Sequence, residues 1–255
     1  MTTGSALPRT VHVEHCMGTV FSIDIRDEGD WSAALANVVE WLHRVDATFS
    51  TYKNDSPISR LGRDEISLTE CPSEVAQVLQ ACDAVTLETG GYFTARPGGQ
   101  LDPSGYVKGW AIERASDILR EQGSSNHAVN GGGDTQCAGE RAPGELWRIG
   151  LAHPLQPGRL TAVVALRDGA VATSGTAERG AHIINPKTDE PATALASISV
   201  TGARLTLVDA YATAGFAMGQ DSLPWLESLP GYEGLLVSAS GHASWSSGFT
   251  GAAGA

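Results

Sequence analysis

Apolar side chains recur at steps of three and four residues in several stretches of this chain, and such spacing predicts amphipathic helices. The clearest helix covers Trp31–Phe49, where the apolar positions form one continuous face. A second begins at about Pro72, a residue favoured in a first helical turn, and is stopped by Gly90-Gly91. Two more are predicted at about Tyr106–Gln122 and Leu207–Met218.

Runs of β-branched and aromatic residues predict strands, most of them in the second half of the chain. Residues Val11–Arg26 indicate a strand or a hairpin around the turn-like Met17-Gly18-Thr19. Asp168-Gly169 predicts a second hairpin, because this dipeptide favours the tight turns that join paired strands. The other candidate strands are Leu146–Ala152, Leu160–Arg167, Ala170–Thr173, Ala196–Val200 and Leu235–Ser238. Helices set among such strands without regular β-α-β spacing favour an α+β fold with antiparallel sheets over a doubly wound parallel sheet.

The composition is that of a folded protein, with 42% hydrophobic and 18% charged residues. A length of 255 residues allows one large domain covering 1–255 or two small ones, and the Gly/Ala tail at 250–255 is expected to be flexible. The net charge of −12 argues against nucleic acid and anionic membranes as partners, because their phosphates would be repelled. No stretch is long and apolar enough for a membrane helix, and the first residues resemble no export signal. We therefore expect no stable membrane insertion and a cytoplasmic protein.

The cysteines at positions 16, 71, 82 and 137 are too widely spaced for a zinc ribbon or a redox pair. They also make no disulfide scaffold in a chain of this size. Free thiols in or near the core are therefore expected.

Four segments carry residues of chemical interest, and the first is Leu101–Ala111. It places Asp102 and a Pro-Ser-Gly turn before a helix whose first turn contains Lys108. A helix start offers free backbone N–H groups and a positive dipole end, which suit a phosphate, and the turn exposes carbonyls that a hard cation could use. An ordinary capped helix with Asp102 in the turn explains the same residues.

The second and third segments are Val129–Asp134 and Thr173–Pro186. The three glycines of the second segment either allow a ligand close to the backbone or form a plain tight turn. The third segment contains His182 directly before two apolar residues and a turn. Histidine is the side chain best suited to accept a proton near neutral pH, although a single histidine is more often structural.

The fourth segment, Thr206–Phe216, places Asp209 and Thr213 four residues apart, on the same face of a predicted helix. A carboxylate and a hydroxyl are ligands that Mg²⁺ accepts while it keeps water and phosphate ligands. The same two residues could instead stabilise the helix start and bond back to a carbonyl. As a residue of the first turn, Asp209 is expected to lie outside the core.

None of the four segments decides the function by itself, but together and in this order they resemble the FAD:protein FMN transferase family, the ApbE type. The resemblance extends from Met17 to about Phe249. The segments that carry it are Met17–Thr19, Phe49–Tyr52 with Asp55–Leu61, Gly91–Phe93, Leu101–Gly105 with Lys108–Ala111, Asn130–Asp134, Thr173–Gly175, His182–Pro186 and Asp209–Ala214.

The resemblance implies an α+β fold of two intertwined T-fold-like halves, with the site between them. It also implies an enzyme that binds FAD and Mg²⁺ and attaches FMN, through its phosphate, to a Thr or Ser of a target protein while AMP is released. The expected partners are therefore FAD and an acceptor protein with a Thr/Ser flavinylation motif.

The same resemblance assigns roles to individual residues. It implies that His182 takes the proton of the target hydroxyl. The implied Mg²⁺ ligands are Asp209, Thr213 and the main-chain carbonyl of Gly105. The residues implied to line the FAD site are Met17, Tyr52, Tyr92, Phe93, Thr94, Asp102, Lys108 and Ile184.

The chain departs from the family pattern in three respects. Asn185 stands where members commonly have Asp, and an amide would not hold a cation there. Ala212 stands where some relatives have a further acidic metal ligand, which implies a lower protein charge at the metal. Relatives that modify exported proteins often carry an export signal, and the first residues here do not resemble one.

Two other functions stay open from the sequence. The same site could use water and act as a FAD pyrophosphatase that yields FMN and AMP. A non-catalytic flavin-binding protein could also keep the pocket, although storage of flavin does not require a base such as His182.

Overall fold

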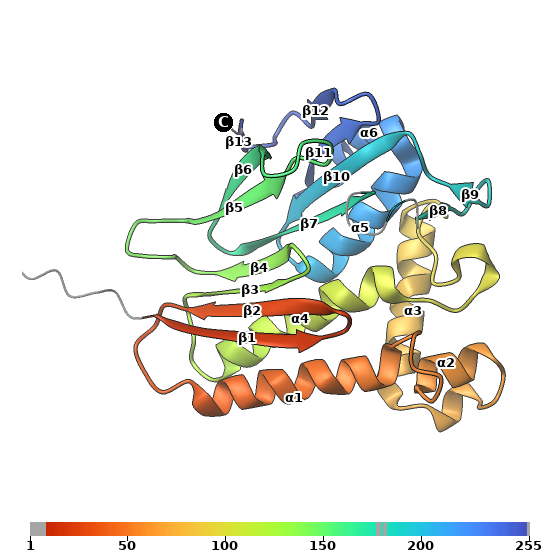
Figure 1. Cartoon of the computed structure of the whole chain (residues 1–255), viewed down its shortest axis with the longest axis horizontal. Helices are drawn as coiled ribbons and strands as arrows, with labels where there is room; N and C mark the ends of the chain where they lie inside the picture. Colours follow the sequence, from red (N-terminus) through yellow and green to blue (C-terminus); the bar gives the residue numbers. More distant parts are fainter. Residues whose placement is uncertain (1–8, 177–179, 181–182, 254–255) are drawn as a thin grey trace, which may run out of the picture.

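The computed structural model describes residues 9–176, 180 and 183–253, and its centre is an eight-stranded antiparallel sheet (Figure 1). The strand order is β1-β2-β3-β4-β7-β10-β11-β12. These strands are β1 (Thr10–Cys16), β2 (Thr19–Ile25), β3 (His127–Gly131), β4 (Asp134–Ala138), β7 (Gly169–Gly175), β10 (Leu195–Gly202), β11 (Glu233–Ser238) and β12 (Ala243–Trp245). The sheet confirms the α+β class that the sequence predicts.

The sheet consists of two halves with the same order of elements. In each half two strands are followed by helices and then by two more strands: β1 to β4 form one half, and β7 with β10 to β12 form the other. The helices are α1 (Ser32–Phe49), α2 (Pro57–Gly62), α3 (Ser73–Glu88), α4 (Ser104–Glu121), α5 (Leu205–Met218) and α6 (Ser222–Glu227), with short 3₁₀ turns η1 (Leu68–Glu70), η2 (Pro97–Gly99) and η3 (Gly219–Asp221). This arrangement agrees with the two intertwined halves that the resemblance implies.

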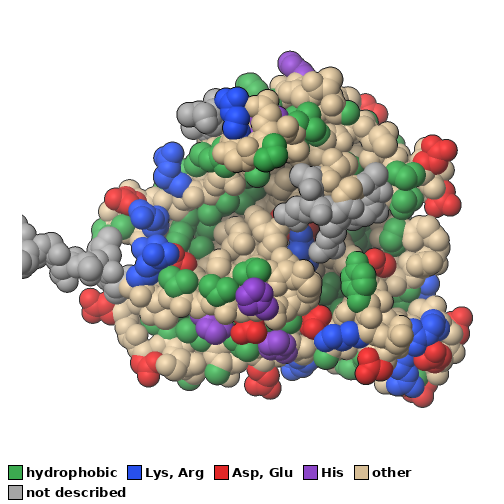
Figure 2. Space-filling model, in the orientation of Figure 1, with side chains coloured by type: hydrophobic (Ala, Val, Ile, Leu, Met, Phe, Trp, Pro, Cys, Tyr) green, Lys and Arg blue, Asp and Glu red, His purple; other side chains and the backbone are tan. Residues whose placement is uncertain are grey.

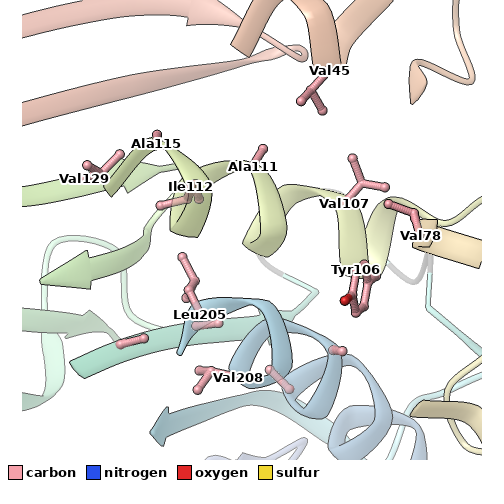
Figure 3. Packing of buried hydrophobic residues seen from close by; sticks show 14 of the residues in the cluster. Val45, Val78, Tyr106, Val107, Ala111, Ile112, Ala115, Val129, Leu205 and Val208 are labelled. Atoms are coloured by element: carbon pink, nitrogen blue, oxygen red, sulfur yellow. The ribbon is translucent and has the colours of Figure 1, made fainter. Parts of the chain in front are cut away.

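Helix α4 lies between α1 and α5 in the main core. Figure 3 shows Val45 of α1 on one side of α4, and Leu205 and Val208 of α5 on the other. Helix α4 can pack closely against its neighbours because it presents small side chains, such as the fully buried Ala111 and Ala115. Burial of such apolar surface stabilises the fold by about 25 cal/mol per Å². Each half of the sheet thus contributes one central helix, and these two helices meet.

The second face of the sheet is covered only in part. Along β7, Ala170 and Ala172 face the helices, whereas Val171 faces a smaller sheet of β5 (Trp147–Ala152), β6 (Leu160–Leu166) and β13 (Ala252–Ala253). None of the described helices or strands covers this face over β1 and β2, and Val11, Val13 and Val20 are exposed there. Figure 2 shows a hollow between this hairpin and the elements above it.

Most of the predicted elements are present. Of the two alternatives predicted for Val11–Arg26, a strand or a hairpin, the structure has the hairpin: Met17 and Gly18 form its two-residue turn with φ of 52° and 68°, as a tight turn of this kind requires. The second segment of interest is also a tight turn, since Gly132 and Gly133, both with positive φ, join β3 to β4. Helix α2 was not predicted from the sequence. All four cysteines are free thiols, as expected.

One prediction about the strand connections was wrong. Asp168-Gly169 does not join paired strands, because β6 pairs with β5 and β13 whereas β7 pairs with β4 and β10. The Asp168 carboxylate instead accepts a hydrogen bond from Gly139 N at 3.1 Å, at the point where the chain passes from one sheet to the other. Residues 252–253 form β13, which pairs with β6, and the flexibility expected for the tail stays a prediction.

Candidate functional site

The N-terminal half of α4 approaches α5 through two glycines. A Cβ on Gly109 would lie 2.7 Å from both the Asp209 Cβ and the Leu205 carbonyl oxygen, and a Cβ on Gly105 would lie 3.2 Å from the Thr213 Oγ1. Gly105 and Gly109 are four residues apart on α4, as Asp209 and Thr213 are on α5, so each pair lies on one helical face. Because Gly105 and Gly109 have no side chains, the backbone of α4 lies against the two predicted metal ligands, Asp209 and Thr213.

Lys108 lies between two buried carboxylates. Its Nζ is 2.5 Å from the Asp134 Oδ2 and 3.8 Å from the Asp209 Oδ1. Both carboxylates also accept backbone hydrogen bonds at 2.9 Å, Asp209 from Gly109 N and Asp134 from Thr173 N. Asp134 is 1% exposed and Asp209 3% exposed. We call Lys108, Asp134 and Asp209 the charged cluster.

Among the residues that the structure describes, the charged cluster has two carboxylates for one ammonium group. Burial raises the pKa of Asp209 to about 7; Lys108 opposes this rise, and the negative charge of Asp134 adds to it. One ammonium group therefore does not fully stabilise both carboxylates. A further cation at this point would lower the free energy of the ionised form.

Magnesium fits the donors that meet here. Asp209 and Thr213 present a carboxylate and a hydroxyl from one face of α5, and Gly105 lies against Thr213. Within the described ranges, no group of three His, Cys, Asp or Glu side chains could hold a metal ion. Magnesium needs no such cage, because it keeps several waters and binds through one or two carboxylates together with substrate phosphates. The donor set suits a magnesium ion that arrives with a phosphate.

Four predicted flavin-site residues lie in the stretch of chain between α3 and α4. Tyr92 lies under the Lys187 ammonium, whose Nζ is 5.1 Å from the ring centroid. Thr94 Oγ1 accepts a hydrogen bond from Arg96 N, and Asp102 Oδ1 accepts one from Ser104 N at the start of α4. Phe93 is 1% exposed in the main core, so its ring has no open face for stacking.

The remaining predicted residues lie on three different segments. Met17 is part of the β1–β2 turn. Tyr52 is on the loop between α1 and α2 and is 90% exposed. Ile184 belongs to β8 (Ile184–Asn185), which pairs with β9 (Glu190–Pro191). His182, the predicted base, lies outside the described residues.

The structure adds two residues that the sequence did not assign and corrects one expectation. Gly109 leaves room for the Asp209 side chain, and Asp134 forms an ion pair with Lys108. The sequence signal for Asp134 was its place after three glycines, which indicated either a ligand close to the backbone or a tight turn and gave its carboxylate no role. Asp209 is not an exposed first-turn residue: α5 begins at Leu205, so Asp209 is in the second turn and is buried against α4.

Across the part of the chain that the structure describes, we find no helix with the length and apolar character needed to cross a membrane. The cytoplasmic location expected from the sequence stays a prediction.

Comparison with known sequences gives a consistent result. A model of the ApbE family matches residues 17–99 and 94–236. A FAD:protein FMN transferase from Rhodobacter capsulatus is 28% identical over 221 residues, covering 83% of this chain and 39% of that protein. One from Haemophilus influenzae is 26% identical over 274 residues, covering 80% of this chain and 79% of that protein. The chain thus spans less than half of the first relative and most of the second.

Solved structures agree with the fold. An ApbE protein from Thermotoga maritima superposes with a TM-score of 0.84 at 23% identity, covering 94% of this chain and 97% of that one. The flavin transferase ApbE from Vibrio cholerae gives a TM-score of 0.81 at 20% identity, covering 95% and 98%. At such identities these structures establish the fold alone.

Proposed function

The chain belongs to the ApbE family, and on this basis we propose that it is a FAD:protein FMN transferase, which moves FMN from FAD to a Thr or Ser of an acceptor protein and releases AMP. The observation that carries the proposal is the charged cluster at the contact of α4 and α5, next to the Gly105–Thr213 contact. A buried excess of carboxylate with a raised pKa is typical of a functional site. The FAD:protein FMN transferases named among the relatives support the choice of reaction.

The residues that would hold Mg²⁺ are Asp209, Thr213 and the carbonyl of Gly105. When bound, the ion supplies positive charge to the diphosphate as its P–O–P bond breaks. Asp134 fixes Lys108 beside Asp209, so the ammonium group is held where a phosphate oxygen could bind it.

The transfer itself forms one bond and breaks one. The acceptor hydroxyl oxygen bonds to the phosphorus on the FMN side, and AMP leaves with the bridging oxygen. The hydroxyl proton passes to His182, which we propose as the general base. Its sequence neighbours Ile183 and Ile184 are described: Ile183 packs against the main core and Ile184 belongs to β8.

The flavin and adenine rings require apolar surface near this centre. Tyr92 and the highly exposed Tyr52 are the aromatic side chains that we propose for contact with the rings. Met17 and Ile184 would add aliphatic surface. Phe93 would support the site without contacting the flavin or adenine ring, because its buried ring packs toward Gly105 at the start of α4. We further propose that one domain carries the whole site, as both halves of the sheet contribute to it.

The direct test is the intact mass of an acceptor protein after incubation with this chain, FAD and Mg²⁺. The acceptor should carry an Asp/Ser-Gly-Ala-Thr/Ser segment, and a variant with Ala in place of the final Thr/Ser is the matched control. We expect a covalent increase equal to FMN minus water, absent with EDTA and absent from the control. AMP release that does not depend on acceptor would identify a pyrophosphatase instead. FAD binding without AMP or adduct would indicate a flavin-binding protein.

A further inference from the structure

The β8–β9 hairpin is attached to the C-terminal end of α5 through one side chain. The Asn185 Nδ2 donates a hydrogen bond to the Ala217 carbonyl oxygen at 3.1 Å. The Asn185 Oδ1 accepts one from Lys187 N at 2.9 Å, within the hairpin turn. Both ends of this amide are therefore used, one within the hairpin and one toward the helix.

The carbonyl that Asn185 binds has no hydrogen-bond donor within its own helix. The last four carbonyls of an α-helix lack such donors, and Ala217 is one residue from the end of α5. The N–H of Gly219 bonds to the carbonyls of Gly215 and Phe216, which leaves the Ala217 carbonyl for the side chain. An N–H donor suits this position, because the C-terminal end of a helix is also the negative end of its dipole.

Ala217 lies on the helical face that carries the predicted metal ligands. It follows Thr213 by four residues and Asp209 by eight, so the three positions share one face of α5. With a rise of about 1.5 Å per residue, Ala217 lies about 6 Å beyond Thr213 along the helix axis. The hairpin is thus tied to the same surface that presents Asp209 and Thr213.

A second contact joins the hairpin to a different segment. The Lys187 Nζ lies over the Tyr92 ring, which belongs to the segment after α3. The hairpin continues to Ile183, whose carbonyl accepts a hydrogen bond from Ala192 N at 2.9 Å. The two contacts fix residues 183–192 between α5 and the Tyr92 segment.

From this geometry we propose that Asn185 is a positioning residue of the transfer site. Its amide ties the hairpin, and with it Ile184, to the face of α5 that carries Asp209 and Thr213. The proposal rests on the proposed function. In this chain a carboxylate at position 185 would lose the bond to Ala217, because it has no proton to donate at neutral pH and would face a carbonyl oxygen at the negative end of the helix. Asn185 therefore acts through its N–H group and does not stand in for an acidic metal ligand.

The test compares Asn185→Asp, Asn185→Ala and wild type. We expect Asn185→Asp to raise the KM for FAD about tenfold, since it loses one hydrogen bond and adds a repulsion. Asn185→Ala loses only the bond and should raise KM about threefold. Asn37→Asp, an exposed site on α1, adds the same charge and should leave KM unchanged. Lys187→Ala removes the second contact and should raise KM by a few-fold.

The Mg²⁺ dependence distinguishes positioning from metal binding. If Asn185 occupied a metal-ligand position, Asn185→Asp would lower the Mg²⁺ concentration needed for half-maximal activity, and this result would overturn the proposal. An unchanged KM in a folded Asn185→Asp variant would overturn it as well.

Hydrogen exchange provides a readout that does not need activity. Faster exchange confined to residues 183–192 and the end of α5 in Asn185→Asp is expected, and wild-type exchange there contradicts the attachment. If the wild type neither binds FAD nor releases AMP while the exchange result holds, the proposed function fails and the attachment alone stands.

Discussion

Helix α4 takes part in two buried polar networks that differ in how well their carboxylates are stabilised. Its N-terminal half holds the charged cluster, with Lys108 between Asp134 and Asp209. Its C-terminal half holds a second network, in which His127 accepts or donates at both ring nitrogens, to Ser116 Oγ and Ser124 Oγ, each at 2.8 Å. We call this second group, which Ser124 extends to Asp27, the His127 network.

The His127 network is complete. Ser124, Ser125 and Asn126 donate hydrogen bonds to the Asp27 carboxylate, and these bonds lower its pKa although burial opposes the shift. His127 is fully buried and both of its nitrogens are used. Burial lowers the pKa of His127 to about 4, so the ring is neutral near pH 7. This network fastens α4 to β3 and requires nothing further.

The charged cluster is incomplete by comparison. Burial raises the pKa of Asp209 to about 7, so the protein maintains a carboxylate that costs stability when ionised. Lys108 is 30% exposed, so one side of the cluster is open to solvent. A satisfied buried network stabilises a fold, whereas an unsatisfied one that can be reached from solvent indicates a place for a ligand. We therefore expect substitutions in the charged cluster to affect mainly catalysis, and substitutions in the His127 network to affect mainly the stability of the fold.

The largest expected effect is on catalysis, from Asp209→Asn. The variant keeps an oxygen for Gly109 N but loses the negative charge that would hold Mg²⁺, so FMN transfer should fall about a thousandfold. The unfolding temperature should be unchanged or higher, because a poorly stabilised charge is removed from the interior. Intact-mass assays and thermal unfolding measure the two quantities. Asp83→Asn, on the exposed face of α3, is the control and should change neither.

A large fall in unfolding temperature with Asp209→Asn would contradict this comparison. It would mean that the charged cluster is a structural element, as the His127 network is.

The second effect is on stability and comes from acid. The folded-state pKa of His127 is below its unfolded value, so between these values the unfolded chain binds a proton that the folded protein does not. Stability should therefore be lost as the pH falls from about 6.5 to about 4, by about 3 kcal/mol in total. Urea unfolding at several pH values measures the loss. His127→Gln should remove most of this pH dependence, and an equal dependence in that variant would show that other groups cause it.

The third and smallest effect concerns the packing that allows the charged cluster to form. A methyl group at Gly109 would meet Asp209 Cβ and a Leu205 backbone oxygen at 2.7 Å, so Gly109→Ala should cost about 2 kcal/mol and also lower transfer. The same change at Gly105 meets only Thr213 and Phe93 side-chain atoms, the nearest at 3.2 Å, and should cost less. Urea unfolding of both variants checks the order. Equal costs would mean that the closer approach of the helices at Gly109 carries no extra penalty.

The sequence predicts those parts of the fold that depend on local pattern. Helix periodicity located four helices to within a few residues, because their buried faces repeat along the chain itself. Turn chemistry located the Met17-Gly18 hairpin for the same reason. Asp168-Gly169 failed because a dipeptide describes a turn and not the partner of the next strand, which the two-sheet topology decides.

The candidate site was predicted in part. Asp209, Thr213 and Gly105 were identified together, and the structure brings them to one helix contact. Asp134 was missed because its contact with Lys108 depends on β4 lying beneath α4, which no local pattern encodes. The burial of Asp209 was missed because it depends on Gly109, one hundred residues earlier in the chain.

The central claim is that the charged cluster is where Mg²⁺ and FAD bind together, and FAD binding measured by fluorescence anisotropy tests it without an acceptor. The titration is made with and without Mg²⁺, for the wild type and for Asp209→Asn. We predict that Mg²⁺ tightens FAD binding to the wild type about tenfold or more and leaves binding to Asp209→Asn unchanged. The same Mg²⁺ effect in both proteins would show that the ion and FAD meet elsewhere, and would contradict the account.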